Sequence, residues 1–215
     1  MANWTLQPFS IPATNGTEAA DTGTSETHVS EALPVGERIA EYFGTDNARL
    51  MMTRPLRRAE LSITHLWRNY EDGDQPVILP ADDAFLVVLY LTDVEHRDVW
   101  PDRPAAPIKS YPKGSICLIS LRQGAGIAIR GGFEALVFHI PRQHLVELAD
   151  EAGEPRVEDL LICRGIEDRT VQNIGAALMP LFDMADDVRD RLLVHVALAF
   201  NAHIAKRYGR SRHKH

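Results

Sequence analysis

The pattern of apolar and polar positions in this chain changes its period several times, and each change predicts a different element. The segment LSITHLWR at residues 61–68 alternates apolar with mostly polar side chains. A period of two is that of a β-strand, whose successive side chains point to opposite faces. Unbroken aliphatic runs at 85–91, 115–121 and 135–140 are typical of strands that are covered on both faces. Turns rich in Gly, Pro and Asp separate these runs, so the pattern predicts a β-sandwich or barrel.

Apolar residues recur at helical spacing in a short segment at 37–43 and over most of the chain after Pro141. Pro141 ends the last strand run, because proline has no N–H to donate to a strand ladder. We expect a helix at 143–151. A second helix follows Asp168 as its N-cap, and a third runs from Asp186 to Tyr208. Gly209 has the place of a C-terminal capping glycine. The glycine-rich stretch 124–132 is not followed by a helix, so turns around a short strand explain it better than a phosphate-binding loop.

The fold class expected from these elements is mainly β with C-terminal helices, an α+β arrangement. With 215 residues, 45% apolar and 25% charged, the composition is that of a globular protein. We expect a flexible start over 1–36, where large apolar side chains are scarce. After this segment we expect a β-domain over 37–164, a helical hairpin over 165–209 and a short basic tail over 210–215.

Charge and cysteine content narrow the class of protein further. The formal net charge of −7 argues against a protein that coats nucleic acid. Cys117 and Cys163 are too few for a disulfide framework and too far apart for a CxxC site. No apolar run is long enough to span a membrane and no secretory signal is recognisable, so the expected compartment is the reducing cytoplasm.

The nine histidines suggest a metal site, but their spacing does not support one. A metal site on a sheet commonly takes two histidines at i and i+2 of one strand, and no predicted strand has that pair. His195 and His203 lie about 12 Å apart on one helix, too far for one ion. No nucleophile elbow and no activated cysteine setting are present. We therefore expect no metal, no cofactor and no catalytic centre.

The last predicted helix has two apolar stripes where one would suffice to face a core. One stripe contains Leu192, Val196 and Phe200, and the other contains Val188, His195, Ala199 and Ala202. The second stripe either packs within the chain or forms a dimer interface. We favour a homodimer, because one side of a terminal helical hairpin has nothing of its own chain to cover it. The candidate interface residues are Leu192, His195, Val196, Ala199, Ala202 and His203.

Several sequence segments, taken in their order, resemble a domain of AraC-family transcription regulators. This is the cupin-like N-terminal domain that binds the effector and dimerises. The segments are FLVVLYL at 85–91, YPKGSICLISL at 111–121, FEALVFHIPRQHL at 133–145 and the helix that ends at Gly209. The resemblance covers residues 50–209. It implies a cupin-like β-barrel or jelly roll, a small-molecule effector and no catalysis. The helix-turn-helix units of such regulators, which contact the major groove, have no counterpart here. We therefore expect DNA binding only through an absent helix-turn-helix domain or a full-length partner.

A ligand in such a barrel would lie among inward-facing strand residues. The candidates are the side chains with polar tips in the sheet region, although ordinary core or rim positions explain them equally well. They are His65, Trp67, Tyr90, Trp100 and His139. The alternative function is a stand-alone cupin-type metalloenzyme, which predicts a transition metal on barrel histidines.

Overall fold

The computed structural model describes residues 34–58, 60–69 and 73–210. The flexible start expected over 1–36 and the basic tail expected over 210–215 lie outside these ranges, except for residues 34–36 and 210.

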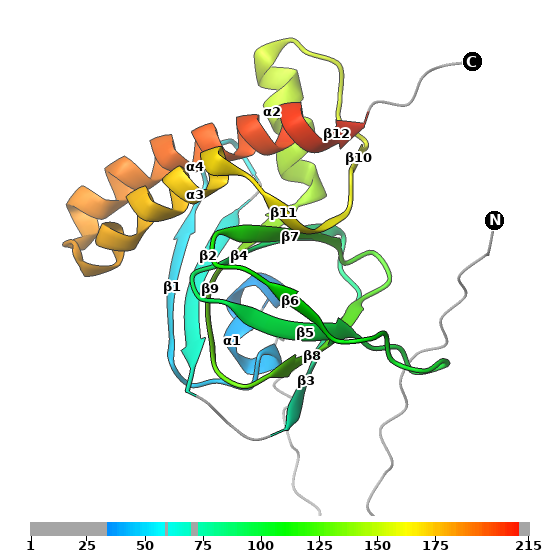
Figure 1. Ribbon diagram of the computed structural model, residues 1–215. Coiled ribbons are helices and arrows are strands. Elements are labelled where there is room, and N and C mark those ends of the chain that lie inside the picture. The colour runs from blue at the N-terminus through cyan, green and yellow to red at the C-terminus, as the bar shows by residue number, and fades with distance from the viewer. Residues whose placement is uncertain (1–33, 59, 70–72, 211–215) are drawn as a thin grey trace, which may run out of the picture. The chain divides into compact units, whose positions relative to one another are not determined.

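Two antiparallel sheets dominate the structure (Figure 1). The six-stranded sheet has the order β1-β2-β9-β4-β7-β11, and the four-stranded sheet has the order β3-β8-β5-β6. The chain passes back and forth between the sheets, so that strands distant in sequence become neighbours. This is the strand order of a jelly roll, and the expected mainly β fold is confirmed. The strands of the two sheets are β1 (Ala48–Thr53), β2 (Leu61–Arg68), β3 (Asp74–Leu79), β4 (Ala84–Tyr90), β5 (Val94–Asp98), β6 (Lys109–Tyr111), β7 (Ser115–Ser120), β8 (Ala125–Arg130), β9 (Phe133–Pro141) and β11 (Cys163–Glu167).

The six-stranded sheet is covered on both faces, which explains the unbroken apolar run in β4. Phe85, Val87 and Leu89 belong to a core between this sheet and the helices. Leu86, Val88 and Tyr90 belong to a second core between the two sheets. Because successive side chains alternate, a strand buried on both faces needs apolar residues at every position.

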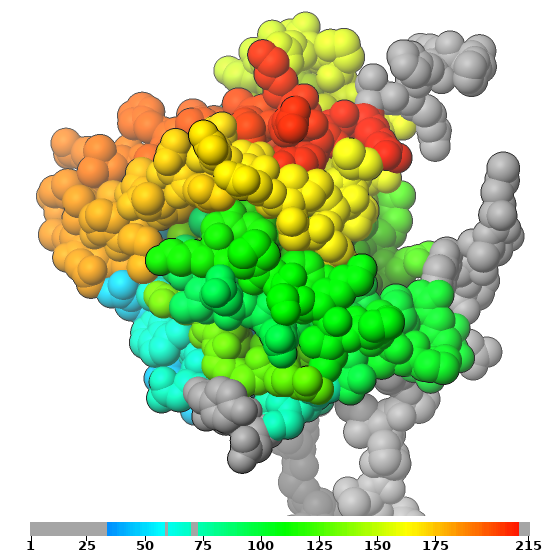
Figure 2. Space-filling view, in the orientation of Figure 1, coloured from blue at the N-terminus to red at the C-terminus, as the bar shows by residue number. Residues whose placement is uncertain are grey.

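The helices α2 (Arg142–Ala152), α3 (Arg169–Leu178) and α4 (Asp186–Tyr208) form a layer on the outer face of the six-stranded sheet. In the space-filling view, the yellow and orange surfaces of α3 and α4 are continuous above the green strands (Figure 2). Phe200 of α4 stacks on Phe138 of β9 with ring centroids 4.0 Å apart. None of the helices in the described ranges is both long and apolar enough to cross a membrane. The helical segments are η1 (Val35–Glu37), α1 (Ile39–Tyr42), α2 (Arg142–Ala152), α3 (Arg169–Leu178), η2 (Met179–Asp183) and α4 (Asp186–Tyr208).

The interior between the sheets is packed with apolar side chains from both sheets and from α1. Ile39 and Phe43, at 1% and 2% exposure, belong to this interior core together with residues of β2, β3 and β4. The barrel interior expected to hold a ligand therefore also receives side chains from the start of the described chain.

Of the two capping residues predicted for the helical hairpin, Asp168 is confirmed and Gly209 is not. Asp168 caps α3 as expected, because its Oδ1 accepts from the backbone N–H groups of Thr170 and Val171 at 3.0 and 3.1 Å. Gly209 is not in the expected left-handed conformation, since its φ is −65° and its ψ is 140°. It starts β12 (Gly209–Arg210), which pairs with β10 (Asp159–Leu160). A Cβ at Gly209 would collide with the Ala205 carbonyl oxygen, so close approach explains this glycine.

Candidate functional site

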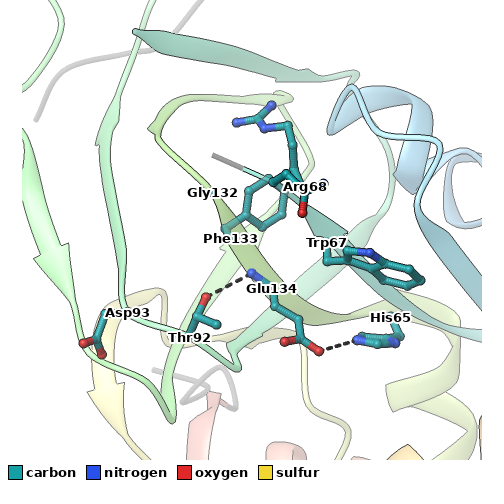
Figure 3. A pocket seen from close by; sticks show the side chains of 9 residues that line it. His65, Trp67, Arg68, Thr92, Asp93, Gly132, Phe133 and Glu134 are labelled. Atoms are coloured by element: carbon teal, nitrogen blue, oxygen red, sulfur yellow. Dashed lines mark hydrogen bonds and ion pairs between the residues drawn. The ribbon is translucent and has the colours of Figure 1, made fainter. Parts of the chain in front are cut away.

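A pocket of about 550 Å³ opens where β2 ends, next to the turns that precede β5 and β9. This volume lies within the range of about 300–1,000 Å³ that is usual for small-molecule sites. Its lining combines aromatic, acidic and basic side chains from segments far apart in the sequence (Figure 3). The lining residues are His65, Trp67, Arg68, Asn69, Thr92, Asp93, Gly132, Phe133 and Glu134.

His65 and Glu134 form the polar centre of this pocket. Their Nε2 and Oε1 atoms are 2.8 Å apart (Figure 3), and a carboxylate can only accept, so the imidazole donates from Nε2. The His65 side chain is 8% exposed, whereas that of Glu134 is 37% exposed. His65 is thus the buried member of the pair, and Glu134 presents its carboxylate toward the opening.

The backbone of Glu134 is held on both sides by the β4–β5 turn. Its N–H donates to the Thr92 hydroxyl at 3.0 Å, and its carbonyl accepts from the Leu91 N–H at 2.8 Å. Trp67 is its direct cross-strand partner in the β2–β9 register. Side chains at such paired positions share a face and lie close together. The carboxylate and the indole are therefore presented side by side by a rigid part of the sheet.

Arg68 lies beneath the pocket, on the side of the sheet that faces the interior. Its guanidinium is 5.0 Å from the Phe133 ring centroid and donates to the Phe43 carbonyl at 3.5 Å. The residue is only 8% exposed. Its guanidinium therefore contacts the C-terminal end of α1 and the Phe133 ring.

Two of the expected ligand-binding residues, His65 and Trp67, lie together in this pocket, although not on the expected face. They share the face of Leu61 and Ile63, which belong to the helix-side core. The His65 ring is 5.6 Å from that of Phe182 in η2. The expectation that they face the interior was wrong, because alternation along a doubly covered strand does not say which face lies between the sheets.

The other three candidates are not part of this pocket or of a common one. Tyr90 is 2% exposed within the interior core. His139 faces the same interior, but its register position is four residues along β9 from Ala135, the partner of Tyr90, a separation of about 13 Å. Its Nε2 lies 2.7 Å from Asp82 Oδ2. Trp100 is in the loop after β5, with the Arg103 guanidinium 3.7 Å from its ring centroid.

His96 is a second polar feature, inside the sandwich. It is 1% exposed, and neither ring nitrogen has a hydrogen-bond partner among the described residues. Its ring stacks on Tyr111 at 3.9 Å and lies 5.8 Å from Tyr90. Burial lowers the pKa of His96 to about 4, so the imidazole is neutral at pH 7. A buried imidazole without partners is an unusual group in a folded protein.

The candidate dimer-interface residues separate into two groups on α4. Leu192 is 44% exposed, and His195, Ala199 and Ala202 are also exposed, so these four share an outer stripe with Val188. Val196 and His203 are half-buried against their own chain, and His203 Nε2 lies 2.8 Å from Asp168 Oδ2. The expected stripe of Leu192, Val196 and Phe200 is not one face in the structure, because Leu192 is exposed and Phe200 is buried. The apolar residues of the inner face are Leu193, Ala197, Phe200, Ile204 and Tyr208.

Neither cysteine has an activated thiol. Cys117 and Cys163 are free and buried, and burial is the largest effect that raises both thiol pKa values. Within the ranges 34–58, 60–69 and 73–210, no three His, Cys, Asp or Glu side chains come together as a possible metal site.

Glu134, Thr92 and Asp93 were missed by sequence reasoning. Their only local signal is a position beside a turn, because Glu134 lies two residues after Gly132 and Thr92-Asp93 follow a predicted strand. The pairing of Trp67 with Glu134 joins strands far apart in the chain, and no local pattern specifies such a partner.

No protein-family model and no curated protein matches this chain. Among solved structures, a variant of Bacillus subtilis oxalate decarboxylase is similar at a TM-score of 0.33 and 14% identity, over 44% of this chain and 25% of that one. The Lactobacillus farciminis oxalate decarboxylase is similar at 0.32 and 11% identity, over 44% and 28%. A cupin superfamily protein from Desulfitobacterium hafniense is similar at 0.31 and 13% identity, over 44% and 78%. The chain spans about a quarter of the length of the oxalate decarboxylases it matches. TM-scores of this size support no statement about activity.

Proposed function

We propose that this chain is a non-catalytic domain that senses a small molecule and dimerises, as in AraC-type transcription regulators. The observation that supports this best is a direct contact between the pocket and the helix pair. His65 lines the pocket and packs on Phe182, which lies in η2 between α3 and α4. A ligand that moves His65 acts directly on the segment that positions α4.

A second contact strengthens the link between η2 and the sheet. Arg49 of β1 lies over the Phe182 ring at 5.1 Å, and its Nη1 is 2.5 Å from Asp183 Oδ1. The segment between the two helices is therefore held by β1, whose Arg49 is the cross-strand partner of the pocket residue His65. A sensor needs such a contact, because a ligand shifts an equilibrium only through groups that differ between the two states.

The proposed partner is a second copy of this chain, bound through the outer stripe of α4. In an antiparallel pairing centred between His195 and Ala199, Leu192 packs on the partner's Ala202 and His195 on the partner's Ala199. Large side chains thus face small ones, which allows the helices to approach closely. The same pairing brings the acidic start of each helix (Asp186, Asp187, Asp190) next to the basic end of the other (Lys206, Arg207). A two-fold interface requires self-complementarity of this kind.

Light scattering on the purified chain tests the dimer. We expect the wild type to be a dimer and Ala199→Arg to be a monomer, because the substitution places a charge at the centre of the stripe. Ala105→Arg is the matched control, since it adds the same side chain to an exposed position in the loop between β5 and β6. A monomeric wild type, or a dimer that survives Ala199→Arg, contradicts the proposed interface.

Elemental analysis of the purified protein separates this proposal from the stand-alone metalloenzyme. The sensing proposal expects no stoichiometric transition metal, whereas the enzyme requires one. A band-shift assay adds a further test, because a chain of net charge −7 is expected not to bind operator DNA by itself.

A further inference from the structure

The pocket beside η2 presents one aromatic face and one carboxylate at adjacent positions of the sheet. Trp67 is half-buried, so part of its indole remains available in the pocket. Glu134 is its cross-strand partner, with a side chain 37% exposed. An indole face next to a carboxylate is the combination that attracts organic cations, through the ring quadrupole and through direct charge pairing.

The carboxylate of Glu134 keeps capacity for a ligand after its internal contact is made. Oε1 accepts the Nε2–H of His65, and no hydrogen bond of Oε2 is recorded among the described residues. An ionised carboxylate has about four lone-pair sites, so one donor leaves most of them open. His65 fixes the direction of the carboxylate, because the imidazole is itself packed between Trp67 at 5.0 Å and Phe182 at 5.6 Å.

The charges around the opening favour a cation over an anion. Asp93 is a second, exposed carboxylate on the rim, where its Oδ1 accepts from the Lys113 backbone N–H at 2.7 Å. The positive group of the lining, Arg68, is 8% exposed and faces Phe133 and the Phe43 carbonyl. Two acidic side chains therefore face the solvent side of the pocket, and the guanidinium faces the protein interior.

We propose that this pocket binds a small organic ammonium ion, which pairs with Glu134 and lies against the Trp67 indole. This inference depends on the proposed sensing function only in its use of the same pocket. A ligand at this position lies next to His65, which packs on Phe182, so occupancy of the pocket is communicated to η2. His65 is a positioning residue here, because it holds the Glu134 carboxylate and does not meet the ligand's charge itself.

Isothermal titration calorimetry with putrescine and tetramethylammonium tests the proposal, with acetate as the anionic comparison. We expect saturable binding of at least one of the two cations, weakening with salt, and none of acetate. Glu134→Gln keeps the shape of the side chain and removes its charge, so we expect affinity to fall about tenfold. Glu95→Gln, an exposed position on β5 outside the pocket, is the matched control and is expected to bind as the wild type does.

Fluorescence locates the binding. In a Trp4→Phe and Trp100→Phe background, Trp67 is the remaining tryptophan of the three in the chain, and its emission should change with the calorimetric affinity. Failure of both cations to bind, preference for acetate, or unchanged affinity in Glu134→Gln overturns the ammonium proposal. Those results leave the dimer experiment unaffected, so failure here is distinguishable from failure of the proposed function.

Discussion

At the scale of single residues, Asp168 connects the N-terminus of α3 to the C-terminal part of α4. Oδ1 accepts from Thr170 and Val171 at the start of α3. Oδ2 accepts from His203 Nε2 at 2.8 Å and from the Tyr208 hydroxyl at 2.7 Å. One carboxylate, 7% exposed, therefore caps α3 and holds the end of α4.

Asp168→Asn should destabilise the protein by about 1–3 kcal/mol, because the amide cannot accept from all of these donors. Urea denaturation at pH 7 measures the effect. Asp150→Asn is the control, since it breaks an exposed pair with Arg156 that should matter little. Equal effects of the two substitutions would contradict the structural role given to Asp168.

The pH dependence of the same variant has a definite sign. Burial acts to raise the pKa of Asp168, but the hydrogen bonds from His203, Tyr208 and Val171 together outweigh burial and lower it below the ordinary 3.8. A carboxyl with a lowered pKa stabilises the fold above its unfolded-state pKa, and this contribution is lost as the pH falls through the folded-state pKa. The difference between wild type and Asp168→Asn should therefore shrink below about pH 4.

For His96 we expect the opposite effect of substitution, because the buried imidazole has no hydrogen-bond partner among the described residues. Replacing a buried group that has no partner by an apolar ring should be neutral or stabilising, by up to about 1 kcal/mol for His96→Phe. Because the pKa of His96 falls from 6.5 to about 4 on folding, the unfolded chain binds the proton first on acidification. The wild type should lose stability as the pH falls from 6.5 to about 4, and His96→Phe should lose less.

Urea midpoints measured across that pH range check this prediction. His195→Phe is the matched control, because His195 is exposed on α4. A His96→Phe variant that keeps the full slope, or that is strongly destabilised, would show that His96 has partners in solution that the described residues do not supply.

At the scale of elements, α3 lies close to the six-stranded sheet because of one glycine. A Cβ on Gly175 would collide with Leu89 Cδ2 of β4, and both residues are buried. A glycine in mid-helix costs about 1 kcal/mol relative to alanine in propensity. The glycine is tolerated because it lets the helix approach the strand.

Gly175→Ala should therefore destabilise the protein by about 1–2 kcal/mol despite the better helix propensity, since overpacking a core costs about 1–3 kcal/mol. In a Leu89→Ala background the same substitution should be neutral or stabilising. Thermal unfolding of the four variants forms a double-mutant cycle. Additive effects would mean that the two residues do not share this contact.

The elements also show how far local sequence determines structure. Strands β2, β4, β7 and β9 and helices α2, α3 and α4 were predicted within a few residues, because their periods are local properties. The rotation of α4 was not predictable. The stretch from Leu192 to Phe200 offers apolar side chains on more than one side, and packing against α3 and the sheet selects which of them is buried.

At the scale of the whole molecule, the β-sandwich and the helical hairpin share one apolar core. The segments expected at 37–164 and 165–209 both contribute to it, with Phe138 of β9 stacked on Phe200 of α4. The outer face of the six-stranded sheet and the inner face of α4 are buried in this one core. The two should therefore unfold together.

Phe200→Ala should lower the free energy of unfolding by about 3–5 kcal/mol, as for other buried aromatic residues. The loss should be the same by fluorescence of Trp67 in the Trp4→Phe and Trp100→Phe background, which reports on the sheet, and by far-UV circular dichroism, which reports chiefly on the helices. Two separate transitions would contradict the shared core. Asn173→Ala, at an exposed position of α3, is the control.

The sequence by itself determined strands β2, β4, β7 and β9, helices α2, α3 and α4, the N-cap at Asp168 and the burial of residues 85–90 on both faces. Each of these depends on neighbours within a turn or a strand. Only the tertiary structure decided which face of β2 lies between the sheets. It also decided that Trp67 is paired with Glu134 and that Gly209 is extended. These features depend on contacts between distant segments, and the free energy of those contacts is set by the packing of the whole fold rather than by a local period.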